Sequence, residues 1–214
     1  MINSINSEQR KHIITIEDPV EFRHKNTKSI ITHREVGKDS DVAEFSDGIR
    51  SSLREDPDII LIGEMRDQET ALAAIQAAQT GHLVFATLHT NSAAETISRL
   101  IDLFPPQKSD TIRVSLAQSL RLIISQKLPK SMTGSRILAY ELMYNMKEIQ
   151  NLIIKEKENF ASQINSKMDN NIKEGMTTLS RSLIRMVREG KLSKKEAFEF
   201  SNDKDGFSKI AGDL

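Results

Sequence analysis

A short, unbroken apolar run near residue 60 constrains the fold of this chain more than any other stretch. The run covers residues 59–62, follows Pro57 and Asp58, and leads directly into Gly63 and Glu64. Four apolar residues in succession, three of them β-branched, are typical of a strand buried on both faces, as in a parallel sheet. The run therefore predicts an α/β fold with residues 59–62 as a central strand.

Glu64 would then lie just beyond the carboxyl end of that strand, where ligands bind in open α/β sheets. A carboxylate at this edge can hold Mg²⁺ or orient a water molecule for phosphoryl transfer. The alternative is a core strand followed by a solvated acid, and the run alone favours neither interpretation.

Two further predicted strands, at residues 11–16 and 82–88, also end in polar residues. These polar residues are Glu17, Asp18 and Glu21 after the first strand, and His89 and Thr90 after the second. If the three strands are parallel, their carboxyl ends meet at one edge and the polar groups converge there. Acids for Mg²⁺ and water, with a polar side chain to sense the γ-phosphate, favour a nucleotide-handling domain over three unrelated turns.

The two histidines of the third strand segment are a poor metal pair. His82 and His89 are seven residues apart, so on one strand they would point to opposite faces. A lone histidine is more often structural than catalytic, and His89 is notable only because it stands at a strand end.

The remaining periodicities predict mostly helices. Helices are expected at residues 1–10, 41–55, 68–80, 92–104, 109–127, 145–153, 176–189 and 193–200, and one more strand is expected at residues 136–143. Little regular structure is expected at residues 24–40, 155–175 and 201–214. Ser92 and Glu95 form a capping box. A helix at 41–55 would place Arg50 and Arg54 on one face, either as solvated cations or as cations beside a phosphate site.

The change from mixed strands and helices to helices alone predicts two domains, an α/β core at 1–144 and a helical subdomain at 145–214.

Lys+Arg and Asp+Glu number 30 each, so no basic field argues for nucleic acid as a partner. Cysteine is absent, which excludes disulfides and cysteine zinc sites. No apolar run approaches the ~20 residues of a membrane span, and residues 1–12 are too polar for a signal peptide. A soluble cytoplasmic protein is expected.

One part of a nucleotide site is missing from the 214 residues. Phosphates are commonly held by a loop of the pattern G-x-x-x-x-G-K-[ST], whose backbone N–H groups and lysine bind them. None of the nine glycines lies in that pattern.

Three segments, in this order and spacing, resemble the motifs of the secretion ATPase superfamily. ITIEDPVEF at residues 14–22 resembles its Asp box, REDPDIILIGEMRD at 54–67 its Walker B region, and TGHLVFATLHTNSA at 80–93 its His box. The members are hexameric motor ATPases of type IV pili and type II secretion, with a RecA-like core. The chain is most similar to the PilT-like retraction branch, because the extension and secretion branches usually carry a four-cysteine zinc element.

The resemblance implies roles for individual residues. Glu17 and Glu21 belong to the acidic box, and one of them is the candidate general base for the attacking water. Glu64 is the Walker B acid, near Mg²⁺ and that water, and His89 senses or couples the nucleotide state. The supporting residues are Asp18, His82 and Thr90. The arginines that match those of the family, among which contacts to a phosphate within or across subunits are expected, are Arg50, Arg54, Arg66 and Arg99.

The family implies that the parent protein hydrolyses ATP with Mg²⁺ in a homohexamer that powers pilus retraction and twitching motility. It would act at the cytoplasmic face of the inner membrane, held by a platform protein and with no membrane segment of its own. In family members the P-loop precedes the stretch that matches residues 1–6, so the 214 residues resemble the C-terminal part of a motor, inactive alone. Residues 148–155 match a retraction-specific segment only in part. Two alternatives stay open: a pilus extension or type II secretion ATPase, and a non-catalytic subunit that modulates rings of an intact relative.

Overall fold

The fold is described from a computed structural model that places residues 1–155 and 158–212. The chain divides into two compact units, one of residues 1–89 with 103–105, and one of residues 90–102 with 106–214. The division falls at residue 90, while the predicted boundary at residue 144 lies inside the second unit, between a strand and a helix. The assignment of residues 1–144 to a catalytic core is a statement about function and stays a prediction.

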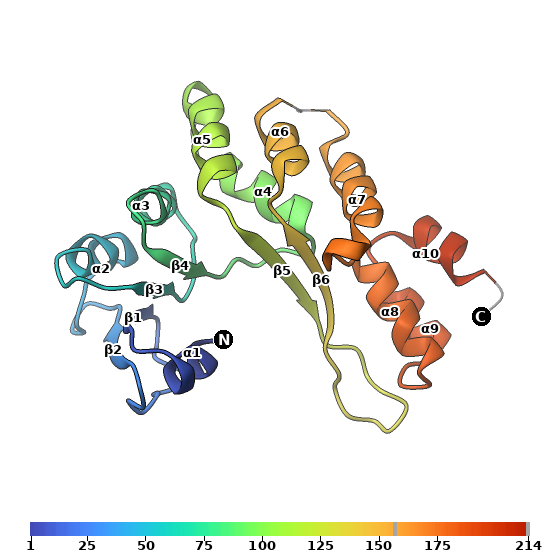
Figure 1. The fold of residues 1–214 in the computed structure, drawn as a ribbon, viewed down its shortest axis with the longest axis horizontal. Helices are drawn as coiled ribbons and strands as arrows, with labels where there is room; N and C mark the ends of the chain where they lie inside the picture. Colours follow the sequence, from blue (N-terminus) through green and yellow to red (C-terminus); the bar gives the residue numbers. More distant parts are fainter. Residues whose placement is uncertain (156–157, 213–214) are drawn as a thin grey trace. The chain divides into compact units, whose positions relative to one another are not determined.

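The first unit is built on a four-stranded parallel sheet with the order β2-β1-β3-β4 (Figure 1). Its strands are β1 (His12–Glu17), β2 (Ile30–Glu35), β3 (Ile59–Ile62) and β4 (Leu83–Ala86). β3 pairs with β1 on one side and with β4 on the other, so the predicted central strand and the parallel α/β fold are confirmed.

Both faces of this sheet are packed, as the apolar run at 59–62 predicts. The helices α2 (Phe45–Ser52) and α3 (Gln68–Gln79) cover one face, where Ile60 and Ile62 are buried with Ile14 and Ile16 (Figure 1). The helix α1 (Ile2–Glu8) packs on part of the other face. Each fully buried isoleucine contributes about 1.5–3 kcal/mol to the stability of the fold. Because successive side chains of a strand point to opposite faces, both faces of the sheet are stabilised in this way.

The structure corrects three expectations in the first unit. The segment 24–40 contains the strand β2, which the predominantly polar sequence of that stretch conceals. The helix α2 ends at Ser52, so Arg54 lies in the following turn and does not share a helix face with Arg50. His82 and His89 flank β4 and are not part of it, so they lie at opposite ends of the strand.

The second unit combines an antiparallel pair of strands with helices. Its elements are α4 (Ala93–Asp102), α5 (Pro106–Ser119), β5 (Leu122–Lys127), β6 (Ala139–Tyr144), α6 (Lys147–Lys155), α7 (Phe160–Asn170), the 3-10 turn η1 (Ile172–Glu174), α8 (Leu179–Arg188), α9 (Lys194–Phe200) and α10 (Lys204–Ala211). At the start of α4 the backbone N–H of Glu95 donates to Ser92 Oγ, which is one half of the predicted capping box, whereas the Glu95 carboxylate accepts from the backbone N–H of Asn91, one residue before the N-cap.

Three predictions in the second unit are wrong. The expected helix at 109–127 ends at Ser119, and residues 122–127 form β5, whose alternate burial comes from pairing with β6. Residues 160–170 form α7, which buries Ile164 and Met168. Residues 204–211 form α10, whose Phe207 is almost fully buried in the core that α8 and α9 also line.

A buried carboxylate joins two helices of the second unit. Glu141 of β6 is 4% exposed and accepts hydrogen bonds from the backbone N–H groups of Ala93 (2.6 Å) and Leu179 (3.4 Å). These residues begin α4 and α8, so the carboxylate satisfies the free N–H groups at two helix starts.

Within the described part of the chain, no helix is both long enough and apolar enough to cross a bilayer.

Candidate functional site

The carboxyl ends of β1, β3 and β4 lie at one edge of the parallel sheet. Ile16, Ile62 and Ala86 are aligned in the register of the three strands. Gly63 extends the pairing, because its N–H donates to the carbonyl of Ile16 at 2.7 Å. A Cβ at Gly63 would lie 3.2 Å from the Cα of Glu17, so glycine lets the two chain segments approach closely. The predicted convergence of the strand ends is therefore present in the backbone.

Glu64 is at the centre of the polar groups on this edge. Its carboxylate contacts Arg66 Nη2 at 2.6 Å and His89 Nε2 at 3.2 Å. The Glu64 side chain is 17% exposed, whereas those of Arg66 and His89 are 63% and 86% exposed. The carboxylate is thus held at the surface of the sheet by Arg66 and His89, whose side chains reach out into solvent.

This arrangement keeps Glu64 ionised. The hydrogen bond from Arg66, opposed by partial burial, lowers the pKa of the Glu64 carboxyl, and the nearby His89 lowers it further. The same contact raises the pKa of Arg66, and Asp18 adds a smaller electrostatic contribution in the same direction. Asp18, Glu64, Arg66 and His89 therefore form one electrostatic cluster.

Thr87 holds the segment that carries Glu64. Its hydroxyl donates to the carbonyl of Gly63, and its own carbonyl accepts from the N–H of Met65 at 3.0 Å. Thr87 is not among the site residues predicted from the sequence. The signal that could have found it is its place one residue beyond β4, beside the segment after β3 in the parallel register.

The acidic segment after β1 is less closely tied to this cluster. The Glu17 side chain is 16% exposed, and its carboxylate lies 3.8 Å from His33 Nδ1. Glu21 is exposed in the loop that follows. Glu17 is adjacent to Gly63 along the edge, whereas the structure gives Glu21 a place on the loop and no contact with Glu64.

The three predicted arginines of the first unit do not gather at one place. Arg66 contacts Glu64, whereas Arg50 is exposed on α2 and pairs with Asp47 at 3.5 Å. Arg54 is exposed in the turn after α2. Arg99 on α4 belongs to the second unit, as does Thr90, whose hydroxyl contacts that of Thr96 at 2.7 Å. The cluster of the first unit therefore includes one of the four arginines.

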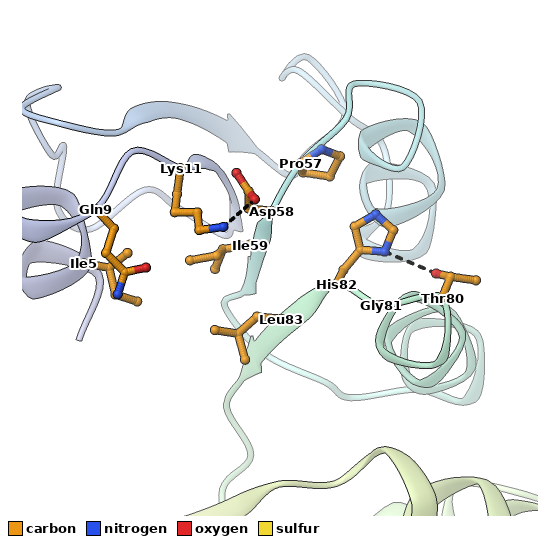
Figure 2. A pocket seen from close by; sticks show the side chains of 10 residues that line it. All are labelled: Ile5, Gln9, Lys11, Pro57, Asp58, Ile59, Thr80, Gly81, His82 and Leu83. Carbon is orange, nitrogen blue, oxygen red and sulfur yellow. Dashed lines mark hydrogen bonds and ion pairs between the residues drawn. The ribbon is translucent and has the colours of Figure 1, made fainter.

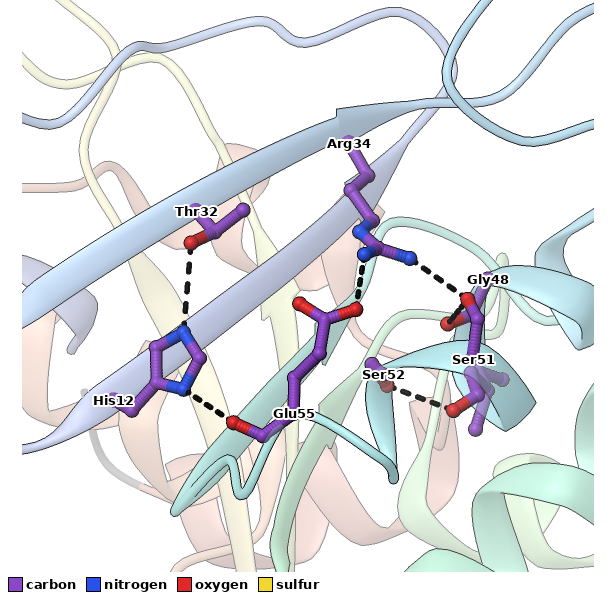
Figure 3. Close-up of polar contacts among 8 residues, drawn as sticks. His12, Thr32, Arg34, Gly48, Ser51, Ser52 and Glu55 are labelled. Carbon is purple, nitrogen blue, oxygen red and sulfur yellow. Dashed lines mark hydrogen bonds and ion pairs between the residues drawn. The ribbon is translucent and has the colours of Figure 1, made fainter.

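A network of polar contacts fixes the connection between α2 and β3 (Figure 3). Arg54 lies in this connection. Arg34 of β2 donates to Ser51 Oγ at 2.7 Å and pairs with the carboxylate of Glu55. His12 Nδ1 lies 3.1 Å from the carbonyl oxygen of Glu55. The chain that leads from Arg50 to the central strand is thus anchored to β1 and β2.

A pocket of about 390 Å³ lies at the opposite, amino edge of the sheet (Figure 2). It is lined by residues from α1, the starts of β1 and β3, and the turn before β4, and Lys11 and Asp58 form an ion pair of 2.7 Å in it. His82 Nδ1 is there 3.0 Å from the carbonyl of Ala77 and 3.2 Å from Thr80 Oγ1. His82 therefore has local structural partners, away from the cluster at Glu64.

The cluster at Glu64 has the donor set for a metal that is also held by a phosphate. Among the described residues, no group of three or more His, Asp or Glu side chains is arranged to hold a metal ion by itself. Mg²⁺ usually keeps several waters and takes one or two carboxylates together with phosphate oxygens. A single carboxylate such as Glu64, with Glu17 nearby, fits that mode of binding.

Comparisons with known proteins identify the family. The model of a family described as type II/IV secretion system protein matches residues 1–135, which is more than half of the chain. The chain belongs to the type II/IV secretion system protein family. The α/β fold and the resemblance to the PilT-like members are confirmed by the individual relatives and structures.

Three relatives illustrate the match. The chain is 44% identical over 207 residues to the type IV pilus retraction ATPase PilT of Pseudomonas aeruginosa, which covers 97% of this chain and 59% of that protein. It is 43% identical over 209 residues to a twitching motility protein of Neisseria gonorrhoeae, covering 97% of this chain and 54% of that protein. It is 54% identical over 91 residues to the type II secretion system protein E of Xanthomonas campestris, covering 42% of this chain and 15% of that protein.

A solved structure agrees with these matches. The crystal structure of the pilus retraction motor PilT with bound ADP has a TM-score of 0.86 and 44% identity, covering 96% of this chain and 57% of that chain. The chain thus spans a little over half the length of the PilT-like relatives it matches. The roles of individual site residues are not tested by these matches and stay predictions.

Proposed function

We propose that residues 1–214 form the part of a motor ATPase that carries its catalytic acids, and that the whole protein hydrolyses ATP to power type IV pilus retraction. The observation that carries the proposal is the cluster of Glu64, Arg66 and His89 at the carboxyl edge of the sheet, in a chain 44% identical to PilT over nearly its whole length. The PilT crystal structure contains ADP, which supports a nucleotide as the ligand of this chain.

In the proposed reaction, the chain's own acids act on the water and the metal. Glu64, kept ionised by Arg66, takes the Walker B role beside Mg²⁺. Glu17 or Glu21 accepts the proton of the attacking water. Mg²⁺, bound with ATP, supplies positive charge to the phosphate oxygens. His89 responds to the nucleotide state, and arginines among Arg50, Arg54, Arg66 and Arg99 supply charge to the phosphates, within one subunit or across a boundary.

The assembly and location follow the family. The proposed working form is a homohexamer at the cytoplasmic face of the inner membrane, bound to a pilus platform protein. The sequence of residues 1–214 carries no G-x-x-x-x-G-K-[ST] loop, so we expect these residues alone to be inactive.

A second candidate is a pilus extension or type II secretion ATPase. It is favoured by the 54% identity to a type II secretion system protein E over 91 residues. It keeps the chemistry and changes the direction of the mechanical work. A third candidate function is that of a modulatory subunit without catalysis, which inserts into rings of an intact relative.

The test is a chimeric chain in which residues 1–214 replace the matching part of P. aeruginosa PilT, expressed in a strain that lacks PilT. Restored twitching is the expected result. A chimera that assembles and hydrolyses ATP without restoring twitching in this strain, but restores pilus assembly or secretion in a strain that lacks the extension or secretion ATPase, would favour the second candidate. A chimera that assembles without hydrolysing ATP would contradict a catalytic role.

A further inference from the structure

The ring of His33 lies between the two segments that carry the acids of the Asp box. β2 places His33 opposite Thr15 in the parallel register, and its side chain is 10% exposed. Its Nδ1 lies 2.9 Å from Thr15 Oγ1 and 3.8 Å from Glu17 Oε1. Its Nε2 lies 3.1 Å from the backbone nitrogen of His24. One ring therefore contacts the strand that ends in Glu17 and the loop that contains Glu21.

These contacts determine where the ring proton is. A backbone N–H can only donate, so Nε2 of His33 must accept the hydrogen bond from His24. The proton of the neutral ring is then on Nδ1, which faces the Thr15 hydroxyl and the Glu17 carboxylate. Both nitrogens have a partner: Nδ1 contacts Thr15 on β1, and Nε2 contacts the backbone of His24 in the loop that follows the Asp box.

The loop after β1 is held by few other contacts near Glu21. The backbone N–H of Val20 donates to the Glu35 carboxylate at 3.3 Å, and that of Thr27 donates to Asn6 Oδ1 at 3.0 Å. His24 stacks on His33 with ring centroids 6.0 Å apart. Glu21 thus lies between the two points, at Val20 and His24, where side chains of β2 hold the loop.

We propose that His33 is a positioning residue of the candidate site. Its ring ties Thr15, two residues before Glu17 on β1, to the backbone of the loop that carries Glu21. The two acids are thereby kept in one arrangement, so that an acid is placed for the attacking water. His33 itself does not touch the proposed substrate position and acts through these two acids. The catalytic consequence rests on the proposed function, whereas the tautomer and the anchoring of the loop do not.

The structural half of the proposal is tested on the 214-residue chain. The ¹⁵N chemical shifts of the His33 ring are expected to show the proton on Nδ1. His33→Leu removes both hydrogen-bonding nitrogens, and loss of one hydrogen bond should raise amide exchange at residues 21–24 by roughly fivefold to tenfold. His33→Gln retains a donor and an acceptor and should keep exchange within about twofold of wild type. His12→Leu, at the other end of the sheet, is the matched control and should leave these amides unchanged.

The catalytic half is tested in the PilT chimera described above. His33→Leu should lower kcat for ATP by roughly tenfold or more with little change in KM, because misplaced catalytic groups cost rate more than binding. His33→Gln should restore most of kcat.

Each possible result separates the claims. A proton on Nε2, or unchanged exchange in His33→Leu, would overturn the anchoring. Faster exchange with unchanged kcat would overturn the positioning role. If the wild-type chimera does not hydrolyse ATP, the proposed function fails and the catalytic consequence with it, while the exchange experiment still decides whether His33 anchors the loop.

Discussion

Glu64 and His89 meet at the carboxyl edge of the sheet, with His89 Nε2 3.2 Å from Glu64 Oε1. The two residues follow neighbouring strands, β3 and β4, and are brought together by their parallel register. The two side chains differ in exposure: that of Glu64 is 17% exposed and that of His89 is 86% exposed. An acid fixed near the sheet and an exposed ring beside it suit a residue that responds to what binds at Glu64.

His89→Ala should uncouple the motor without unfolding it. The exposed ring fills no core cavity, so its removal is expected to shift the melting temperature of the chain by no more than about 2 °C, as for surface substitutions generally. In the chimera, pilus retraction should fail. Thermal unfolding and a twitching assay check the two parts, with His82→Ala as the comparison variant. A large loss of stability in His89→Ala would support a structural role instead.

Arg66→Gln should raise the pKa of Glu64. The Arg66 hydrogen bond is the main cause that lowers this pKa, and removing it should move the value back toward the ordinary 4.5. A carboxyl whose pKa is lower in the folded state than in the unfolded state stabilises the fold above its unfolded pKa, and this contribution is lost as the pH falls through the folded pKa. Arg66→Gln should therefore also reduce the contribution of Glu64 to the free energy of unfolding above the unfolded pKa. A ¹³C NMR titration of Glu64 measures the shift, with Arg99→Gln as the control. An unchanged titration would show that the ion pair does not persist in solution.

Glu141 should make the second unit less stable as the pH rises. Burial raises the pKa of this carboxyl, and the N–H groups of Ala93 and Leu179 oppose the shift only in part. Because the folded pKa lies above the unfolded value of 4.5, the stabilising contribution is complete below pH 4.5 and is lost as the pH rises through the folded pKa. Glu141→Gln, which cannot titrate, should show a flatter dependence in that window. Denaturant unfolding at several pH values compares the two, and parallel curves would contradict the expectation.

The parts of the fold that the sequence predicts are those in which local pattern and burial agree. The run at 59–62 is apolar on both faces, and β3 is in fact covered on both faces, so its place and that of Glu64 could be predicted. Residues 122–127 have apolar side chains that fit either a helical stripe or an alternating strand, and only the pairing with β6 decides. β2 was missed because Ile31 is the one residue that it buries.

The contacts of the site depend on strand order, which the sequence does not contain. His33 contacts Thr15 because β2 pairs with β1, and Thr87 contacts Gly63 because β4 pairs with β3. Arg66 could be matched to the family from the sequence. Its ion pair with Glu64 could not be predicted, because it depends on the conformation of the turn after β3. The predicted shared face of Arg50 and Arg54 failed because α2 ends two residues before Arg54.

Residues 1–214 alone should not bind ATP with micromolar affinity. The proposed acids repel a triphosphate, and the chain has no G-x-x-x-x-G-K-[ST] loop to supply successive N–H groups and a lysine. Each charge-assisted hydrogen bond that is lost costs on the order of 1.5–3 kcal/mol, and several are lost together. Calorimetry with Mg²⁺ and ATP on the 214-residue chain and on the chimera checks this. Micromolar binding by the 214-residue chain would require a phosphate site elsewhere.

The central claim is that Glu64 acts on the metal or the water of ATP hydrolysis, and its most direct test is turnover by the purified chimera with and without Glu64→Gln. A group that acts in the transition state contributes to rate more than to binding, so Glu64→Gln should lower kcat by roughly 100-fold or more while ATP affinity changes by less than about threefold. Glu69→Gln, at the start of α3, is the matched control and should retain activity. Turnover of Glu64→Gln within a few-fold of the unsubstituted chimera would contradict the account.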